Sequence, residues 1–218
     1  MAGVADDFGR ARRRMVVEHV LERGISDPAV LEAMARVPRH LFVEEALEPR
    51  AYGDWSLPIG FGQTISHPFT VALLVAALDL RSGDRVLEVG TGSGYQAAVL
   101  GQLAANVLSI ERVSGLAARA RRNLDRARIY NVAVRVGDGT LGWRGEAPFD
   151  AVIVAAGGPE IPRPLVEQLA PGGRLVVPVG RTDEQVLVRV TAGSTGPVTE
   201  VLGDCRFVPL VGRFGFGA

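Results

Sequence analysis

Three alternating glycines are the residues whose spacing most clearly indicates chemistry. Gly90, Gly92 and Gly94 directly follow an apolar run at 86–89 that predicts a buried strand, and the residues after Gly94 predict a helix. Glycine suits such a junction because a Cβ would block the turn or a ligand that approaches the backbone. The junction lies at the carboxyl end of a strand, where open α/β sheets bind their ligands, so we predict a nucleotide-like cofactor there.

Two acids near these glycines bear on the choice of cofactor. Residues 92–97 also fit the loose dinucleotide pattern G-x-G-x-x-G/A. Glu88 precedes the turn, where a carboxylate repels a pyrophosphate and attracts the ammonium group of a sulfonium amino acid. Glu111 ends the next apolar run, where an acid that binds ribose hydroxyls is expected. The residues therefore allow S-adenosylmethionine or NAD, and Glu88 favours the former.

Polar residues in two other segments are candidates for the same site. Asp138 follows the third expected parallel strand and can accept a hydrogen bond from an adenine amino group, although an Asp-Gly turn without a ligand also explains it. Ser66 precedes a helix expected from about residue 67. It is equally well explained as the N-cap or as a group that binds an anion at the helix N-terminus. We interpret His67 as a helix-start residue.

The composition fits one soluble α/β domain. The chain has 218 residues, of which 47% are hydrophobic, enough for a sizeable core. Lys plus Arg and Asp plus Glu number 24 each, so no net basic field attracts nucleic acid. The one cysteine, Cys205, cannot form an internal disulfide, which agrees with a reducing compartment. We expect a cytoplasmic monomer with no metal site and no membrane span.

Apolar periodicity predicts alternating strands and helices. Helices are expected at 5–23, 28–36, 94–104, 114–127 and 162–169, and strands at 86–89, 107–110, 133–136, 150–155 and 174–179. This alternation predicts a parallel sheet with helices on both faces. Strand patterns at 185–191 and 198–208, with no helix between them, predict an antiparallel edge hairpin. We therefore predict a Rossmann-like, doubly wound class I methyltransferase domain over residues 1–218, with 1–66 as an N-terminal helical extension on the substrate side.

Several segments resemble the protein-L-isoaspartate O-methyltransferase family. The resemblance extends from about residue 37 to 212 and rests on residues 58–68, 86–98, 110–112, 137–139, 147–150, 177–180 and 207–210. The glycine turn alone indicates only a class I methyltransferase. The Gly-Gln-Thr-Ile-Ser run that ends at Ser66 and the Phe-Val-Pro-Leu run at 207–210 are specific to this family.

The resemblance implies an enzyme that uses S-adenosylmethionine to methylate the α-carboxylate of L-isoaspartyl residues in damaged proteins and peptides. The ester then collapses to a succinimide, and hydrolysis returns some normal aspartate. Ser66 matches the active-site serine, and substrate contacts are expected from Thr64, Ile65, Ser66 and Val179. The expected cofactor-binding residues are Glu88, Gly90, Thr91, Gly92, Ser93, Gly94, Glu111, Asp138 and Gly139.

One position departs from the family pattern. Ala155 stands where the family often has a threonine, so a hydroxyl is missing after the fourth expected strand. Relatives that methylate an aspartate of one dedicated peptide precursor, and so form an aspartimide, share these motifs and remain the alternative. An NAD-dependent dehydrogenase and a non-catalytic peptide-binding protein are the rivals from other classes.

Overall fold

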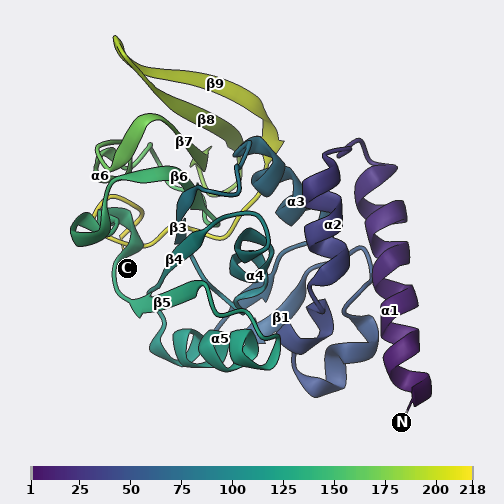
Figure 1. Ribbon diagram of the computed structural model, residues 1–218. Helices are drawn as coiled ribbons and strands as arrows, with labels where there is room; N and C mark the ends of the chain where they lie inside the picture. The colour runs from purple at the N-terminus through teal and green to yellow at the C-terminus, as the bar shows by residue number, and fades with distance from the viewer. Residues whose placement is uncertain (1, 218) are drawn as a thin grey trace.

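A mixed seven-stranded sheet forms the centre of the computed structural model, which describes residues 2–217, with side chains described from Asp7 onward (Figure 1). The order is β5-β4-β3-β6-β7-β8-β9. The strands are β3 (Arg85–Val89), β4 (Asn106–Glu111), β5 (Val132–Val136), β6 (Phe149–Val154), β7 (Leu169–Gly180), β8 (Gln185–Gly193) and β9 (Gly196–Cys205). Strands β3 to β7 are mutually parallel, and β8 runs antiparallel to both its neighbours, so the predicted edge hairpin is confirmed.

The strand order creates a switch point at β3. The chain runs from β3 to β4 and β5 on one side, and then returns to place β6 on the other side of β3. The connection that leaves β3 and the connection that leaves β6 therefore run in opposite directions, which opens a crevice at the carboxyl ends of these two strands. The predicted glycine turn follows β3 directly, so the sheet topology positions it at this crevice.

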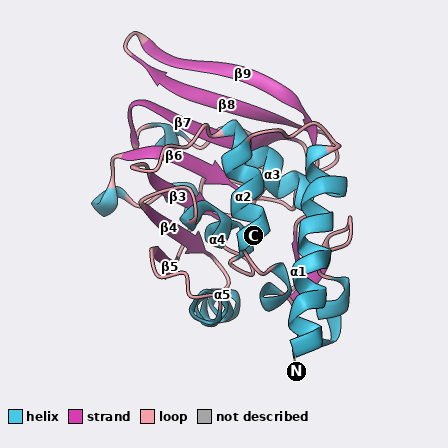
Figure 2. Ribbon diagram, turned by 45° about the vertical axis from the view of Figure 1, so that its right-hand side comes forward, coloured by secondary structure: helices cyan, strands magenta, loops and turns pink. Residues whose placement is uncertain are grey.

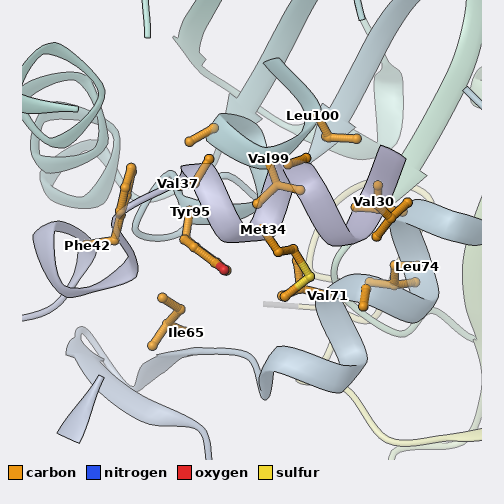
Figure 3. Packing of buried hydrophobic residues seen from close by; sticks show 14 of the residues in the cluster. Val30, Met34, Val37, Phe42, Ile65, Val71, Leu74, Tyr95, Val99 and Leu100 are labelled. Carbon is orange, nitrogen blue, oxygen red and sulfur yellow. The ribbon is translucent and has the colours of Figure 1, made fainter. Parts of the chain in front are cut away.

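Alternate residues of the strands face two apolar cores. In β6, Ala151 and Ile153 belong to the core that contains residues of the larger helices, and Val152 and Val154 belong to the other core. Helices that contribute to the first core include α1 (Ala2–Val16), α2 (Pro28–Arg36), α3 (Pro68–Ala77), α4 (Tyr95–Gly101) and α5 (Ser114–Arg126). Figure 3 shows residues from α2, α3 and α4 interdigitating in the first core. The second core is covered mainly by α6 (Arg163–Val166) and loops.

The N-terminal segment adds a helical layer beside the sheet (Figure 2). It consists of α1 (Ala2–Val16), a π-helical turn (Val17–Leu21), α2, two 3₁₀ turns (Arg39–Phe42 and Glu45–Arg50), and a hairpin of β1 (Leu57–Gly60) and β2 (Gln63–Ile65). Asp27 caps α2 by accepting hydrogen bonds from the Ala29 and Val30 N–H groups at 2.8 and 3.3 Å. None of the described helices has the length and apolar composition needed to cross a membrane.

One predicted helix is much shorter than expected. The expected helix at 162–169 is reduced to α6, and β7 begins at Leu169, ahead of the expected residue 174. Leu169 pairs with Phe149 of β6, whose N–H donates to the Gln168 carbonyl at 2.9 Å. Pairing with β6 thus draws these residues into the sheet and ends the helix early.

Candidate active site

A cavity of about 200 Å³ lies at the carboxyl ends of β3, β4 and β6. Segments far apart in the sequence line it: residues 63–66 from the hairpin, 89–93 from the glycine turn, and 208–211 from the C-terminal segment. The ends of β4 and β6 complete the wall at 110–113 and 155–156. The structure therefore brings the two family-specific motifs and the glycine turn together around one space.

The glycine turn adopts backbone conformations that other residues rarely tolerate. Gly90, Gly92 and Gly94 have φ angles of 95°, 55° and 89°. Gly94 is the N-cap of α4, and its N–H donates to the Thr91 carbonyl at 2.9 Å. A Cβ on Gly94 would lie 3.3 Å from the Cβ of Ala120, so α5 also limits the space there. The predicted strand–turn–helix junction is therefore present, and Thr91 and Ser93 line the cavity beside it.

Glu111 joins the end of β4 to the glycine turn. One carboxylate oxygen accepts the Gly92 N–H at 2.8 Å, and the other accepts the Val113 N–H at 2.9 Å. The residue is only 7% exposed and lines the cavity. A carboxylate has about four acceptor positions, so two remain for ligand hydroxyls. This placement is compatible with the expected contact to a ribose.

Glu88 does not line the cavity, contrary to the expected contact with an ammonium group. Its side chain points to the α4 side of the sheet, where it accepts hydrogen bonds from Ser109 Oγ at 2.5 Å and Gln96 Nε2 at 3.1 Å. It is 0% exposed. Burial raises its pKa to about 8, even though both hydrogen bonds act to lower it. Glu88 thus links β3 to β4 and to the helix α4 that follows the glycine turn.

Asp138 also lies outside the cavity lining, although the adjacent Gly139 is part of it. One carboxylate oxygen accepts the Thr140 N–H at 2.9 Å and the Thr140 hydroxyl at 2.6 Å, and the other accepts the Arg213 N–H at 2.8 Å. Burial acts to raise the pKa of Asp138, but hydrogen bonds from Arg213 and Thr140 outweigh it and leave the pKa below its ordinary value. Asp138 therefore connects the turn after β5 to the C-terminal segment, and its contact with adenine stays a prediction.

Ser66 is not the cap of α3. The helix begins at Pro68, and its N-cap is His67, which makes no side-chain capping bond. The capping explanation of Ser66 is therefore wrong, and the helix-start interpretation of His67 is confirmed. Ser66 lines the cavity together with Thr64 and Ile65. Within residues 2–217, the Ser66 carbonyl accepts a hydrogen bond from Arg39 Nη2 at 2.7 Å, and no hydrogen bond of its hydroxyl is found.

The composition of the cavity wall differs from the sequence-based expectation at Val179 and at residues 208–211. Val179 lies in β7, pairs with Val186 and packs against the second core, so it does not reach the cavity. The wall instead includes residues 208–211, held by bonds from Gly157 N–H to the Val208 carbonyl at 2.8 Å and from Leu210 N–H to the Gly157 carbonyl at 2.7 Å. The Phe-Val-Pro-Leu motif was the available signal for this segment.

Ala155 does line the cavity, close to the glycine turn. A Cβ built on Gly90 would lie 3.5 Å from the Cβ of Ala155. A side chain at position 155 therefore faces the space between β3 and β6. The missing hydroxyl noted in the sequence is thus absent from the wall of the candidate site itself.

Comparison with known proteins agrees with this geometry. The family model described as "Protein-L-isoaspartate(D-aspartate) O-methyltransferase (PCMT)" matches residues 11–215. A protein-L-isoaspartate O-methyltransferase of Syntrophotalea carbinolica is 56% identical over 211 residues, which cover 96% of this chain and 97% of that protein. A protein of the same name from Syntrophus aciditrophicus is 56% identical over 215 residues, with 97% and 98% coverage.

Solved structures give the same result at lower identity. A protein-L-isoaspartate O-methyltransferase has a TM-score of 0.84 at 29% identity and covers 93% of this chain and 67% of that one. A Plasmodium falciparum structure described as a protein-L-isoaspartate O-methyltransferase β-aspartate methyltransferase, in complex with S-adenosyl-L-homocysteine, has a TM-score of 0.79 at 29% identity, with 92% and 98% coverage. The chain therefore belongs to the protein-L-isoaspartate(D-aspartate) O-methyltransferase family.

Proposed function

We propose that this enzyme transfers a methyl group from S-adenosylmethionine to the free α-carboxylate of L-isoaspartyl residues in damaged proteins and peptides, and so starts their repair through a succinimide. The observation that carries the proposal is the shared cavity. The family-specific Ser66 and the glycine turn line the same space. Relatives that cover nearly the whole chain bear the corresponding name.

The residues of the cavity fit S-adenosylmethionine. The glycine turn exposes backbone that a ligand can approach closely, and Glu111 retains acceptor positions for ribose hydroxyls. When bound, the cofactor supplies an electrophilic methyl group on a sulfonium. A Glu111 carboxylate suits the ribose of S-adenosylmethionine and of NAD alike, so the family match rather than this acid argues against the dehydrogenase alternative.

The cavity has a smaller volume than most binding sites for small molecules. Its volume of about 200 Å³ lies below the roughly 300–1,000 Å³ that is typical of such sites. We infer that part of its wall moves outward when the cofactor enters. The 208–211 segment is the natural candidate, because it does not belong to a strand of the main sheet. Hydrogen bonds with Gly157 hold this segment, and a hydrogen bond from the Arg213 N–H to Asp138 holds the chain just after it.

In this reaction the protein has to orient the two reactants and does not have to transfer a proton. A carboxylate with a pKa of about 4 is already ionised at neutral pH, so no general base is required. Ser66 would donate its hydroxyl hydrogen to one carboxylate oxygen and hold the anion in line with the methyl group. Thr64 and the backbone at Ile65 would align the peptide. Such positioning can lower the barrier by roughly 7 kcal/mol or more.

Paired peptides test the substrate assignment. An isoaspartyl peptide and its aspartyl twin of the same sequence are incubated with enzyme and radiolabelled S-adenosylmethionine. We expect methyl transfer to the isoaspartyl peptide only. Equal labelling of both peptides contradicts the proposal. Labelling of neither, with S-adenosyl-L-homocysteine still bound, would favour the dedicated-peptide alternative, which the names of the relatives do not support.

We also propose that residues 1–218 act as one domain, with 1–66 as its substrate-side extension. The contribution of β2 and Ser66 to the cavity wall supports this division. We propose a monomer in the cytoplasm. The exposed acids Glu200 and Asp204 on the edge strand β9 disfavour edge-to-edge pairing of two copies, and the single Cys205 suits a reducing compartment. Light scattering after size exclusion tests the oligomeric state.

A further inference from the structure

Arg39 is a fully buried arginine directly behind the candidate active site. It begins the 3₁₀ turn Arg39–Phe42 and is 0% exposed. Its Nε donates to the Ala51 carbonyl at 2.8 Å, and its Nη2 donates to the Ser66 carbonyl at 2.7 Å. Its Nη1 has no hydrogen-bond partner among the residues that the structure describes. The side chain is therefore bound to the Ser66 segment, and the Tyr95 hydroxyl is the further polar group that acts on its pKa.

Among the side chains that the structure describes, residues 7–217, no acid forms an ion pair with this guanidinium. The titratable groups that influence its pKa are Tyr95 and Tyr52, and its Cζ lies 4.7 Å from the centre of the Tyr95 ring. Burial lowers the pKa of Arg39, yet an arginine remains protonated in proteins. A buried charge without a counter-charge is strongly unfavourable, so its presence calls for an explanation beyond packing.

The surroundings of Arg39 add positive charge rather than remove it. Arg12 of α1 faces Tyr52, whose hydroxyl lies 2.7 Å from His40 Nδ1. Burial, with help from Arg12 and Arg126, lowers the pKa of His40 to about 4, so this histidine is neutral at pH 7. Glu48 lies 4.0 Å from Arg126 and offsets its charge, so the positive charge added beside Arg39 comes from Arg12. Such a region favours an anion in the adjoining space.

Only one layer of protein separates Arg39 from the cavity. Ser66, to which it donates, and Tyr95, on which it stacks, both line the cavity wall. We propose that Arg39 is a positioning residue that holds the Ser66 segment in place and sets a buried positive charge behind the site of the substrate carboxylate. This inference rests on the proposed function, because that function supplies the anion.

The chemistry predicts which kinetic constant depends on this charge. During transfer, a carboxylate oxygen forms a bond to the methyl carbon while the methyl–sulfur bond breaks and its electron pair stays on sulfur. The carboxylate loses its negative charge as the ester forms. A nearby cation therefore stabilises the bound carboxylate more than the transition state, so loss of the charge by itself should raise KM without lowering kcat.

Two substitutions separate charge from structure. Arg39→Gln removes the charge and keeps a donor, whereas Arg39→Lys keeps the charge and loses the planar fork. Arg36→Gln is the control, because Arg36 is an exposed arginine on α2 that pairs with Glu32. Each protein, saturated with S-adenosyl-L-homocysteine, is titrated with an isoaspartyl peptide and with the same peptide carrying an α-carboxamide. Methyl transfer to the acid peptide gives kcat and KM.

We expect Arg39→Gln to weaken binding of the acid peptide by about tenfold or more, and binding of the carboxamide twin by less than about threefold. Arg39→Lys should stay close to wild type for the acid peptide. Equal weakening of both peptides in Arg39→Gln would mean that Arg39 has a purely structural role. Unchanged binding of the acid peptide would overturn the proposal as well.

The wild-type protein decides the matter if Arg39→Gln does not fold. The proposal requires wild type to bind the acid peptide about tenfold or more tightly than the carboxamide. Equal binding overturns the role of Arg39 and leaves the proposed methylation intact, provided that the acid peptide is methylated. If wild type binds S-adenosyl-L-homocysteine but neither methylates nor binds the acid peptide, the proposed function itself fails, and this inference fails with it.

Discussion

The carboxylate of Glu111 accepts the backbone N–H of Gly92 at 2.8 Å. The side chain at the end of β4 therefore holds the centre of the glycine turn after β3, while it also lines the cavity. Two neighbouring strands of the sheet are joined at the point where a ligand would lie. The contact gives this acid a role in shaping the turn, and we propose that the same carboxylate also contacts a ribose.

Substitution of Glu111 tests both roles together. A glutamine can accept only one of the two N–H groups through its carbonyl and turns an amide donor toward the other. We expect Glu111→Gln to weaken S-adenosyl-L-homocysteine binding by about 2 kcal/mol, since hydrogen bonds to a charged group are lost. Calorimetric titration measures this, with Glu160→Gln as the exposed control. An unchanged affinity would remove Glu111 from the cofactor site.

Ser66→Ala should affect the rate and leave stability unaltered. Loss of a hydrogen bond to the carboxylate should lower kcat/KM for an isoaspartyl peptide by roughly ten- to a thousandfold. Because His67 is the cap of α3, the free energy of unfolding should change by less than about 0.5 kcal/mol. Ser56→Ala, at an exposed serine directly before β1, is the control. Full activity combined with reduced stability would contradict the assignment.

Glu88 predicts a specific pH dependence of stability. Its pKa in the folded protein is about 8, against an ordinary value of 4.5, so folding favours the protonated form. The resulting stabilisation is fully present below about pH 4.5 and is lost as the pH rises through 8, with a slope of up to about 1.4 kcal/mol per pH unit.

Glu88→Gln should remove that dependence, because the amide stays neutral throughout. Urea unfolding of wild type and variant at several pH values between 5 and 8.5, about the range over which Glu88 titrates, gives the comparison. Glu160→Gln should retain the wild-type slope, because that residue is exposed. Equal slopes for wild type and Glu88→Gln would show that Glu88 is ionised in the folded protein.

Asp138 should control how long the cofactor stays bound. Its carboxylate holds the Arg213 N–H at 2.8 Å and thereby the segment that includes Leu210 and Val211 of the cavity wall. We expect Asp138→Asn to raise the dissociation rate of S-adenosyl-L-homocysteine by roughly fivefold to tenfold, for a loss of about 1 kcal/mol. Stopped-flow dissociation measures this, with the exposed Asp183→Asn as control. No change in rate would mean that the segment does not limit release.

The lowered pKa of Asp138 also predicts how the rate of cofactor release depends on pH. Because the folded-state pKa lies below the ordinary value, the contribution of Asp138 is present at neutral pH and is lost as the pH falls through the folded-state pKa. Cofactor release by wild type should therefore accelerate only in acid, below the ordinary aspartate value of about 4. Asp138→Asn should show little of this acceleration.

Local rules predict much of the fold. The period of the apolar residues locates the strands, and the glycine turn, the Asp27 cap and the edge hairpin follow from turn and cap chemistry. Such features depend on neighbours in the sequence. The helix expected at 162–169 is shorter because β6 pairs with Leu169, a contact between distant segments that no local pattern reveals.

The candidate site was less predictable than the fold, because it too depends on contacts between segments that are distant in the sequence. A strand buried on both faces is apolar along its whole length, so its sequence does not show which face Glu88 occupies. The position of Ser66 was recoverable, because proline favours the first helical position and Pro68 therefore points to residue 67 as the cap. The roles of Arg39 and Asp138 depend on contacts with residues 66 and 213, which only the folded chain brings together.

The position of residues 208–211 in the cavity wall has a consequence for biosynthesis. The glycine turn and the hairpin leave the ribosome long before this segment, so a growing chain holds an incomplete cavity until residues 208–211 have emerged. Cofactor binding therefore cannot assist the early stages of folding during synthesis. A chain that stops short of this segment should build most of the sheet and still lack methyltransferase activity, so catalytic competence has to wait for the synthesis of residues 208–211.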